Sequence, residues 1–447
     1  MKKFDLRGIR PQIAEVWRLS LPAILTQITT IAMQYIDSAM VGALGADASA
    51  AIGLVSSSTW VISGVCYGVS AGFSVQVAHH IGGEKDKDAR NVVRHGLLAA
   101  AVVSALLLII GFSIFKPLPQ WLGGEPAIQR DASLYFLLFV LMLPFFQLNS
   151  LCSSYLQCCG DMLTPSILNA VMCVLDVLFN AIFIPIYGVL GAGIGTTTAC
   201  AVVALLMLWF CCVKNPRIRL RKETQPFKWD IIIKAIKIGT PVALEEVAMC
   251  GAMVVSTVII APLGTVAIAA HSFAVTAESL CYMPGYGLGS AATTLVGRSV
   301  GAGKVDEAKR YGTICTVMGA IFMGITGLAM IICCPLVFKM LTPDPAVREL
   351  ATSCLRIELI AEPLFAVSIV AAGALRGVDD TLVPGLMGLG SIWVIRLGIA
   401  FLLVGRFGLH GMWIAMSVEL CIRGLLILYR FCTSKHYDRF RKPEVQM

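Results

Sequence analysis

Four polar side chains recur at helical spacing in an apolar stretch near the start of the chain. Asp37 is preceded by Gln34, Thr30 and Gln27 at intervals of three, seven and ten residues. A helix makes one turn every ~3.6 residues, so these intervals put the four side chains on one face. A carboxylate beside amides and a hydroxyl can bind a proton or a cation. The structural alternative is a hydrogen-bond anchor between two helices.

A second carboxylate occupies a later apolar stretch. Asp176 and Asn180 are one helical turn apart, and Asn169 lies two turns before Asp176 on the same side. In the next stretch, threonines 196–198 follow glycines that permit close helix approach. Two carboxylates in a low-dielectric interior repel each other, and a proton or cation between them relieves that repulsion. Asp37 and Asp176 are therefore candidates for a coupling role, with the structural anchor as the alternative for each.

The second half of the chain offers different acidic positions. Glu246 lies near the start of one apolar stretch, and Glu278 shares a helical face with Tyr282 in the next. Glu246 or Glu278 could form a second site for a proton or an organic cation. The structural alternative is an ion pair with Arg396 or Arg356.

The composition defines the elements that must position these side chains. Hydrophobic residues make up 57% of the 447 residues and charged residues only 14%, against about 25% charged residues in soluble proteins, which excludes a soluble protein. The charges cluster between apolar stretches long enough to cross a ~30 Å hydrocarbon layer. An ionisable residue inside such a span costs roughly 2.5–3.5 kcal/mol on insertion scales, so each one is a functional candidate. We predict an all-α integral membrane protein with twelve transmembrane helices, near residues 14–41, 48–78, 95–115, 131–155, 164–186, 189–213, 231–261, 266–296, 311–336, 349–374, 384–405 and 409–432.

Basic residues gather in every second connection between the predicted spans. They cluster in residues 2–10, 85–94, 214–222, 298–310 and 435–442. By the positive-inside rule these segments face the cytoplasm. This bias accounts for the net charge of +8, so we do not expect nucleic acid as a partner. We expect a multi-pass protein of the bacterial plasma (inner) membrane with both termini in the cytoplasm.

The second half of the chain repeats the first at a shift of 219 to 220 residues. The matched positions keep their order, from Pro22 with Pro241 and Tyr67-Gly68 with Tyr286-Gly287 to Lys85 with Lys304, Asp161 with Asp380 and Pro165 with Pro384. Ordered matches among such different residue types indicate a duplication. Since each half has six spans, the copies share an orientation and are related by a pseudo-two-fold axis along the membrane normal.

The polar linker in the middle of the chain divides these copies. We predict six-helix lobes over residues 1–213 and 231–432, a cytoplasmic linker over 214–230 and a basic cytoplasmic tail over 433–447. Two homologous lobes are typical of a transporter whose substrate binds between them and whose lobes rock to give alternating access. Enzyme-like patterns fail in context: Gly68–Gly72 fits G-x-S-x-G but lies inside an apolar helix. We therefore expect a transporter driven by an ion gradient, and not an enzyme.

Several stretches resemble the multidrug and toxic compound extrusion (MATE) family. They are Tyr35–Gly42, Gly264–His271, Met283–Gly303 and Leu375–Thr381 with Pro384. The resemblance covers essentially the whole chain. It implies a cation-coupled exporter of amphipathic, often cationic, drugs. It also implies H+ or Na+ as the coupling ion. Asp37 most resembles the DinF-like branch, in which such an aspartate is implicated in proton coupling.

The resemblance also implies a cation site, with one difference. Relatives with a described site have the first-helix Asp, an Asn followed one turn later by an Asp on the fifth helix, and a Thr on the sixth. Here Asp176 takes the Asn place, Asn180 the Asp place and Thr198 the Thr place. The reversal moves one carboxylate by about 6 Å along the helix. It favours a proton over Na+, although Na+ at Asp37, Asp176, Asn180 and Thr198 stays the alternative.

The most consistent hypothesis is a secondary antiporter that exports amphipathic or cationic organic compounds in exchange for protons. Substrate-cavity candidates are Gln27, Met33, Gln34, Glu246, Glu278 and Tyr282. We expect small-molecule drugs and the lipid bilayer as partners, a monomeric protein, and no cofactor beyond the coupling ion. One alternative is a lipid-linked saccharide flippase of the same superfamily, which would need a strongly basic cavity. The other is a membrane-embedded enzyme, which would need a catalytic cluster at the membrane interface.

Overall fold

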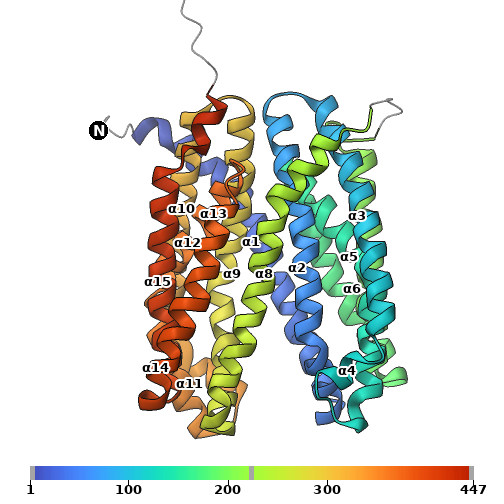
Figure 1. Ribbon diagram of the computed structural model, residues 1–447, viewed down its shortest axis with the longest axis vertical. Helices are drawn as coiled ribbons and strands as arrows, with labels where there is room; N and C mark the ends of the chain where they lie inside the picture. Colours follow the sequence, from blue (N-terminus) through green and yellow to red (C-terminus); the bar gives the residue numbers. More distant parts are fainter. Residues whose placement is uncertain (1–5, 221–225, 442–447) are drawn as a thin grey trace, which may run out of the picture. The chain divides into compact units, whose positions relative to one another are not determined.

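A computed structural model describes residues 6–220 and 226–441, and every regular element among them is a helix (Figure 1). The basic residues Lys2, Lys3, Arg221, Lys222 and Lys442 of the predicted cytoplasmic segments lie outside the described residues. The same holds for residues 442–447 of the predicted tail. The all-α prediction is confirmed.

Six long helices make up the first half of the chain. They are α1 (Leu6–Gly42), α2 (Ala46–Gly82), α3 (Asp86–Ile114), α5 (Pro126–Cys158), α6 (Leu163–Tyr187) and α7 (Val189–Trp209), with a short α4 (Leu118–Trp121) after α3 and a π-helical turn η1 (Phe210–Lys214) at the end of α7. Each helix covers most of a predicted span, and several helices begin before or end after the predicted bounds.

The second half begins with three long helices and ends in shorter elements. The long helices are α8 (Trp229–Ile260, followed by the 3-10 turn η2, Ala261–Leu263), α9 (Thr265–Gly301) and α10 (Val305–Leu341). The remaining elements are α11 (Pro345–Glu358), α12 (Glu362–Arg376), α13 (Leu382–Gly390), η3 (Ser391–Arg396), α14 (Leu397–Phe407), α15 (Leu409–Thr433) and η4 (Lys435–Phe440). Among the described residues, eleven helices are long and apolar enough to cross a membrane, and a twelfth span results if α11 and α12 count as one.

The predicted span over 349–374 is not a straight helix. It consists of α11 and α12, which meet at an angle of 57°. Pro363 is the cause, because it has no N–H to donate to the carbonyl of Leu359 and is tolerated only in the first turn of a new helix. The break places Glu358 at the end of α11 and Glu362 at the start of α12.

Contacts within the chain group it into two compact units. The first unit comprises residues 28–247, and the second comprises the described residues before 28 and after 247. Both α1 and α8 are therefore divided between the units. The lobes predicted from the repeat, 1–213 and 231–432, each keep one of these helices whole. Compared with those lobes, the compact units exchange two helix halves. The first half of α1, up to residue 27, belongs to the second unit, and the first half of α8, up to residue 247, belongs to the first unit.

Glycines related by the repeat allow the exchanged helix halves to pack closely. Gly68 of α2 faces Ala243 of α8, and a Cβ added at Gly68 would lie 2.7 Å from the Cβ of Ala243. In the other unit Gly287 of α9 faces Ile24 of α1, with a corresponding distance of 2.7 Å to the Ile24 nitrogen. Gly68 matches Gly287 at the shift of 219, and Ile24 matches Ala243. The repeat in the sequence is therefore also a repeat of this helix contact, which needs a residue without a Cβ.

In both halves the chain that follows the last helix folds back on the third one. Arg217 pairs with Asp86 of α3 at 3.2 Å, and Arg441 pairs with Asp306 of α10 at 3.5 Å. Asp86 and Asp306 lie one position apart in the repeat, since Lys85 matches Lys304 at the shift of 219. Such partly exposed pairs are worth ~0–1 kcal/mol each. They orient the linker and the tail, and they contribute little to the stability of the fold.

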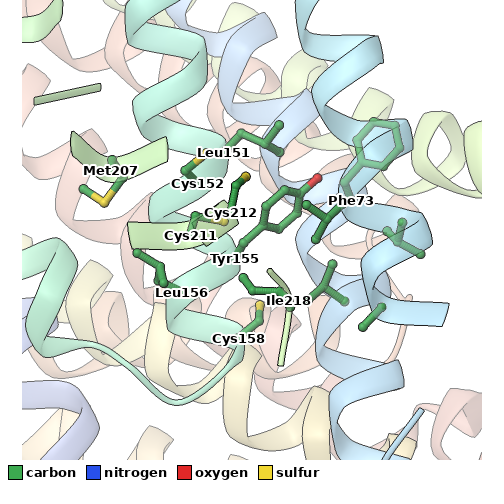
Figure 2. Close-up of a cluster of buried hydrophobic side chains, with 14 of the residues drawn as sticks. Phe73, Leu151, Cys152, Tyr155, Leu156, Cys158, Met207, Cys211, Cys212 and Ile218 are labelled. Carbon is green, nitrogen blue, oxygen red and sulfur yellow. The ribbon is translucent and has the colours of Figure 1, made fainter. Parts of the chain in front are cut away.

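The core of the first unit is rich in cysteine at the end where the linker begins (Figure 2). Tyr155 of α5 lies fully buried among Cys152, Cys211 and Cys212, and its hydroxyl occupies the space that a side chain at Gly96 would need. All sixteen cysteines are free thiols. Small apolar thiols fill the gaps beside the bulky ring, as expected for residues that serve in packing.

Candidate functional site

One amide joins the two carboxylates that the sequence singled out in the first unit. The Nδ2 of Asn180 donates to Asp37 Oδ1 at 2.8 Å and to Asp176 Oδ2 at 3.3 Å. Asp37 comes from α1 and the other two residues from α6. Three of the four predicted coupling residues therefore meet, and we refer to them as the Asp37–Asp176–Asn180 site.

Two residues of the Asp37–Asp176–Asn180 site are fully buried, and each of them has one oxygen without a hydrogen-bond partner among the described residues. Asp176 and Asn180 are 0% exposed. Within the described part of the chain, Asp176 Oδ1 and Asn180 Oδ1 have no hydrogen-bond partner. A buried oxygen without a partner costs about 1–3 kcal/mol, and more if it is charged. A proton or cation at the site would satisfy these oxygens and reduce the repulsion between the two carboxylates.

Glycines of α7 bring α6 to its position. A Cβ at Gly195 would collide with Asn180 Oδ1 and come within 3.0 Å of the Asn180 backbone nitrogen. One turn earlier, a Cβ at Gly191 would collide with the Phe183 carbonyl. Residues four apart lie on the same helix face, so this row of glycines forms the surface against which α6 packs.

Substitution of Gly195 by Ala is expected to disturb the site directly. The added methyl group must displace Asn180 or move α6, and overpacking of this kind costs typically 1–3 kcal/mol. We expect a lower midpoint of thermal unfolding. Gly398→Ala in α14 is the matched control, because a Cβ there meets nothing within 4 Å. Equal behaviour of the two variants would contradict the proposed packing.

Thr198, the fourth predicted coupling residue, uses its hydroxyl differently. It donates to the carbonyl of Ile194 in its own helix at 2.7 Å. In the part of the chain that the structure describes, no hydrogen bond joins Thr198 to Asp37, Asp176 or Asn180. The structure instead places Tyr135 of α5 within electrostatic range of both carboxylates. Sequence reasoning missed Tyr135, since an isolated tyrosine among apolar residues carries no spacing signal.

The predicted cavity residues of α1 fall on both sides of the boundary between the units. Met33 is half-buried and Gln34 is exposed, and both belong to the first unit with Asp37. Gln27 belongs to the second unit. Glu246 belongs to the first unit, where it packs against Gly64 of α2.

A second group of buried carboxylates lies in the second unit. Glu278 of α9 is 5% exposed, and Glu358 and Glu362, on either side of the helix break, are 0% exposed. Within the described residues, all four carboxylate oxygens of Glu358 and Glu362 lack a hydrogen-bond partner. Glu358 interacts electrostatically with Glu278 and with Glu362. We call these three residues the Glu278–Glu358–Glu362 cluster.

The sequence contains a pattern that indicates this cluster, although it was not among the predicted site residues. Glu358 and Glu362 are one turn apart and stand directly before Pro363 in an otherwise apolar span. Interrupted helices near the membrane midplane are typical of binding sites in transporters. By this rule, the acidic pair followed by a proline indicates both a helix break and buried carboxylates at that break.

Of the ion pairs suggested for Glu246 or Glu278, those of Glu278 do not form among the described residues. Arg396 pairs with Glu419 at 2.7 Å, and Arg423 also pairs with Glu419 at 3.1 Å. Arg356 donates to the backbone carbonyl of Ile331. Glu419 of α15 was missed because the predicted pairing considered only the acidic residues of the seventh and eighth spans. Its oxygens lie between two arginines that only the packing of η3 against α15 brings together.

Aromatic rings lie beside the cluster. The ring of Tyr282 packs edge-on against Tyr286 at 6.1 Å and tilted against Phe365 at 5.4 Å between centroids. The Arg423 guanidinium lies over the Phe365 ring, 5.3 Å from its centre. Aromatic faces next to carboxylates are a suitable surface for an organic cation.

These observations define a class of protein. Buried carboxylates on membrane-spanning helices, one group in each repeated half, are features of a membrane transporter. A protein-family profile described as MatE matches residues 22–182 and 241–402. The two matched segments begin at Pro22 and Pro241, which the repeat pairs with each other. The chain belongs to the MatE family of membrane transporters and is not an enzyme.

Relatives along the whole chain agree with this assignment. "Probable multidrug resistance protein NorM" of Thermotoga maritima is 28% identical over 439 residues, which cover 95% of this chain and 93% of the relative. "Multidrug resistance protein NorM" of Burkholderia vietnamiensis is also 28% identical, over 93% of this chain and 92% of the relative.

Solved structures show the same fold. A MOP superfamily transporter from Pyrococcus furiosus matches with a TM-score of 0.91 at 18% identity, over 97% of each chain. An outward-facing multidrug resistance MATE family transporter matches with a TM-score of 0.90 at 19% identity, again over 97% of each chain. The predicted two-lobe architecture of twelve helices is confirmed at the level of the fold.

Proposed function

We propose that this protein is a secondary antiporter that exports amphipathic, often cationic, organic compounds in exchange for protons. The names of the NorM relatives support multidrug efflux. The distribution of basic residues supports a bacterial plasma membrane protein with cytoplasmic termini. Asp37 supports the DinF-like branch, and the protein works as a monomer.

The observation that carries the proton assignment is the single amide shared by two carboxylates. Asn180 supplies one NH2 group to Asp37 and Asp176, and the remaining oxygens of Asp176 and Asn180 are buried without partners. One proton on the pair satisfies the site without any rearrangement of ligands. Protonation and deprotonation of this pair couple the proton gradient to the exchange of conformations.

Sodium suits the Asp37–Asp176–Asn180 site less well. A hard cation needs several oxygens arranged around it at once. The Thr198 hydroxyl is directed to its own helix, and the Nδ2 of Asn180 already lies against both carboxylates. A sodium ion would have to displace that NH2 group, whereas a proton leaves it in position.

Transport is therefore expected to follow an imposed pH gradient and to persist when Na+ is replaced by choline. Ethidium efflux from proteoliposomes, measured under separately imposed pH and Na+ gradients, tests this assignment. We expect a rate that rises with the pH gradient and is unchanged, within about 20%, by removal of Na+. Efflux that stops without Na+ would overturn the proton assignment.

The Glu278–Glu358–Glu362 cluster is the proposed second site of the same function. Its buried carboxylates and the neighbouring Tyr282 ring offer charge and an aromatic face to a cationic substrate or a second proton. A saccharide flippase would need unpaired basic groups for a pyrophosphate. Arg396 and Arg423 instead share Glu419 as partner, which disfavours that alternative.

A further inference from the structure

An apolar groove opens on the membrane-facing surface of the first unit, and its lining includes none of the residues of the Asp37–Asp176–Asn180 site. It has a volume of about 500 Å³ and lies between α3, α5 and α7, and its lining includes Leu97, Leu148, Leu205, Trp209, Val213 and Leu220. Leu205, Trp209 and Val213 are 56%, 47% and 59% exposed. Their side chains therefore face the hydrocarbon of the bilayer. The volume falls within the ~300–1,000 Å³ typical of small-molecule sites.

Two basic residues directly neighbour lining residues of this groove. Lys214 follows the lining residue Val213, and its ammonium lies 5.4 Å from the centre of the Trp209 ring and 4.7 Å from that of Phe210. Arg219 precedes the lining residue Leu220, and its side chain is exposed. The groove thus combines a hydrocarbon-lined body with a positively charged end.

The backbone at this end has an unusual form. Phe210–Lys214 is a π-helical turn, which the Asn215 N–H closes by donating to the Phe210 carbonyl at 3.0 Å. The Leu220 N–H then donates to the Cys212 carbonyl at 2.8 Å, so the linker folds back over the groove. π-Helical turns are rare and are frequent at functional sites. Here the turn and the fold-back place Lys214 and Arg219 next in sequence to the lining residues Val213 and Leu220.

We propose that this groove binds an anionic diacyl phospholipid of the cytoplasmic leaflet. One acyl chain occupies the groove, and the phosphate group meets Lys214 and Arg219. The charge of the rim selects an anionic headgroup over a zwitterionic one, because a basic residue at the membrane surface attracts anionic lipid. The bound lipid holds η1 and the linker against α3 and α5.

Native mass spectrometry of the purified full-length protein, titrated with dioleoylphosphatidylglycerol or dioleoylphosphatidylcholine, tests this proposal. We expect the first equivalent of the anionic lipid to bind at least about fivefold more tightly than the zwitterionic lipid. Lys214→Gln should weaken binding of the anionic lipid by roughly fivefold and leave the zwitterionic lipid unaffected. Leu205→Trp, which fills the groove, should remove the tight equivalent of the anionic lipid.

Two matched variants control for surface charge and for bulk. Lys116→Gln removes a lysine that also lies over an aromatic ring, 5.7 Å from the Phe115 centre, but outside the groove. Leu106→Trp adds the same bulk at a similarly exposed position of α3 that does not line the groove. Both should bind lipid as the wild type does. Equal affinity for the two lipids, unchanged binding by either groove variant, or the same loss in a control variant would overturn the proposal.

Discussion

Replacement of Asp37 by Asn is expected to abolish proton-driven efflux while the fold stays intact. Asn has nearly the shape of Asp, and its carbonyl oxygen can still accept from the Nδ2 of Asn180, which lies 2.8 Å from Asp37 Oδ1. The variant loses the charge that binds and releases a proton. Ethidium efflux driven by a pH gradient should fall by an order of magnitude or more, with the midpoint of thermal unfolding within about 2 °C of the wild type.

Ser256 provides the control for this experiment. The repeat pairs Ser256 with Asp37, and its side chain is buried in the second unit. Ser256→Ala removes a small polar group at the corresponding position without removing a charge, so efflux should be retained. Undiminished efflux by Asp37→Asn, or an equally severe loss in Ser256→Ala, would refute the assignment of proton coupling to the first half.

The second large effect is expected from Arg396→Met, on stability. Glu419 is 0% exposed and depends on Arg396 and Arg423 for its charge partners, with Ser391 donating a further hydrogen bond at 2.7 Å. Removal of one partner from a buried ion pair costs about 3–5 kcal/mol. Because Arg423 remains, we expect a value near the lower end. The midpoint of thermal unfolding in detergent should fall by roughly 5 °C or more.

Arg441→Met serves as the comparison, because it also removes one partner of an ion pair. The side chains of Arg441 and Asp306 are 60% and 82% exposed, and the pair is separated by 3.5 Å. Water solvates both charges when the pair is broken, so we expect a change of only ~0–1 kcal/mol. A fall in unfolding midpoint as large for Arg441→Met as for Arg396→Met would show that burial of Glu419 does not determine the effect.

The sequence by itself determined the class of fold and the repeat. Apolar stretches of membrane-spanning length can only form helices in a bilayer, since hydrocarbon offers no partners for backbone N–H and C=O groups. Helical periodicity then placed Asp176 and Asn180 on one face of one helix, as the structure confirms. The match of Gly68 with Gly287 was visible at the shift of 219, although its reason, a close contact between helices in each unit, was not.

Tertiary structure alone decided which side chains meet. Residues 143 positions apart, Asp37 and Asn180, share a hydrogen bond, and no local spacing encodes such a contact. The partner of Arg396 was Glu419 and not Glu278, because packing of non-adjacent helices chooses among several carboxylates that are equal in sequence. The helical periodicity of a sequence describes one helix at a time, whereas a site is built from the faces of several helices. How those helices are rotated and shifted along their axes relative to one another follows from the shapes of all the side chains packed between them.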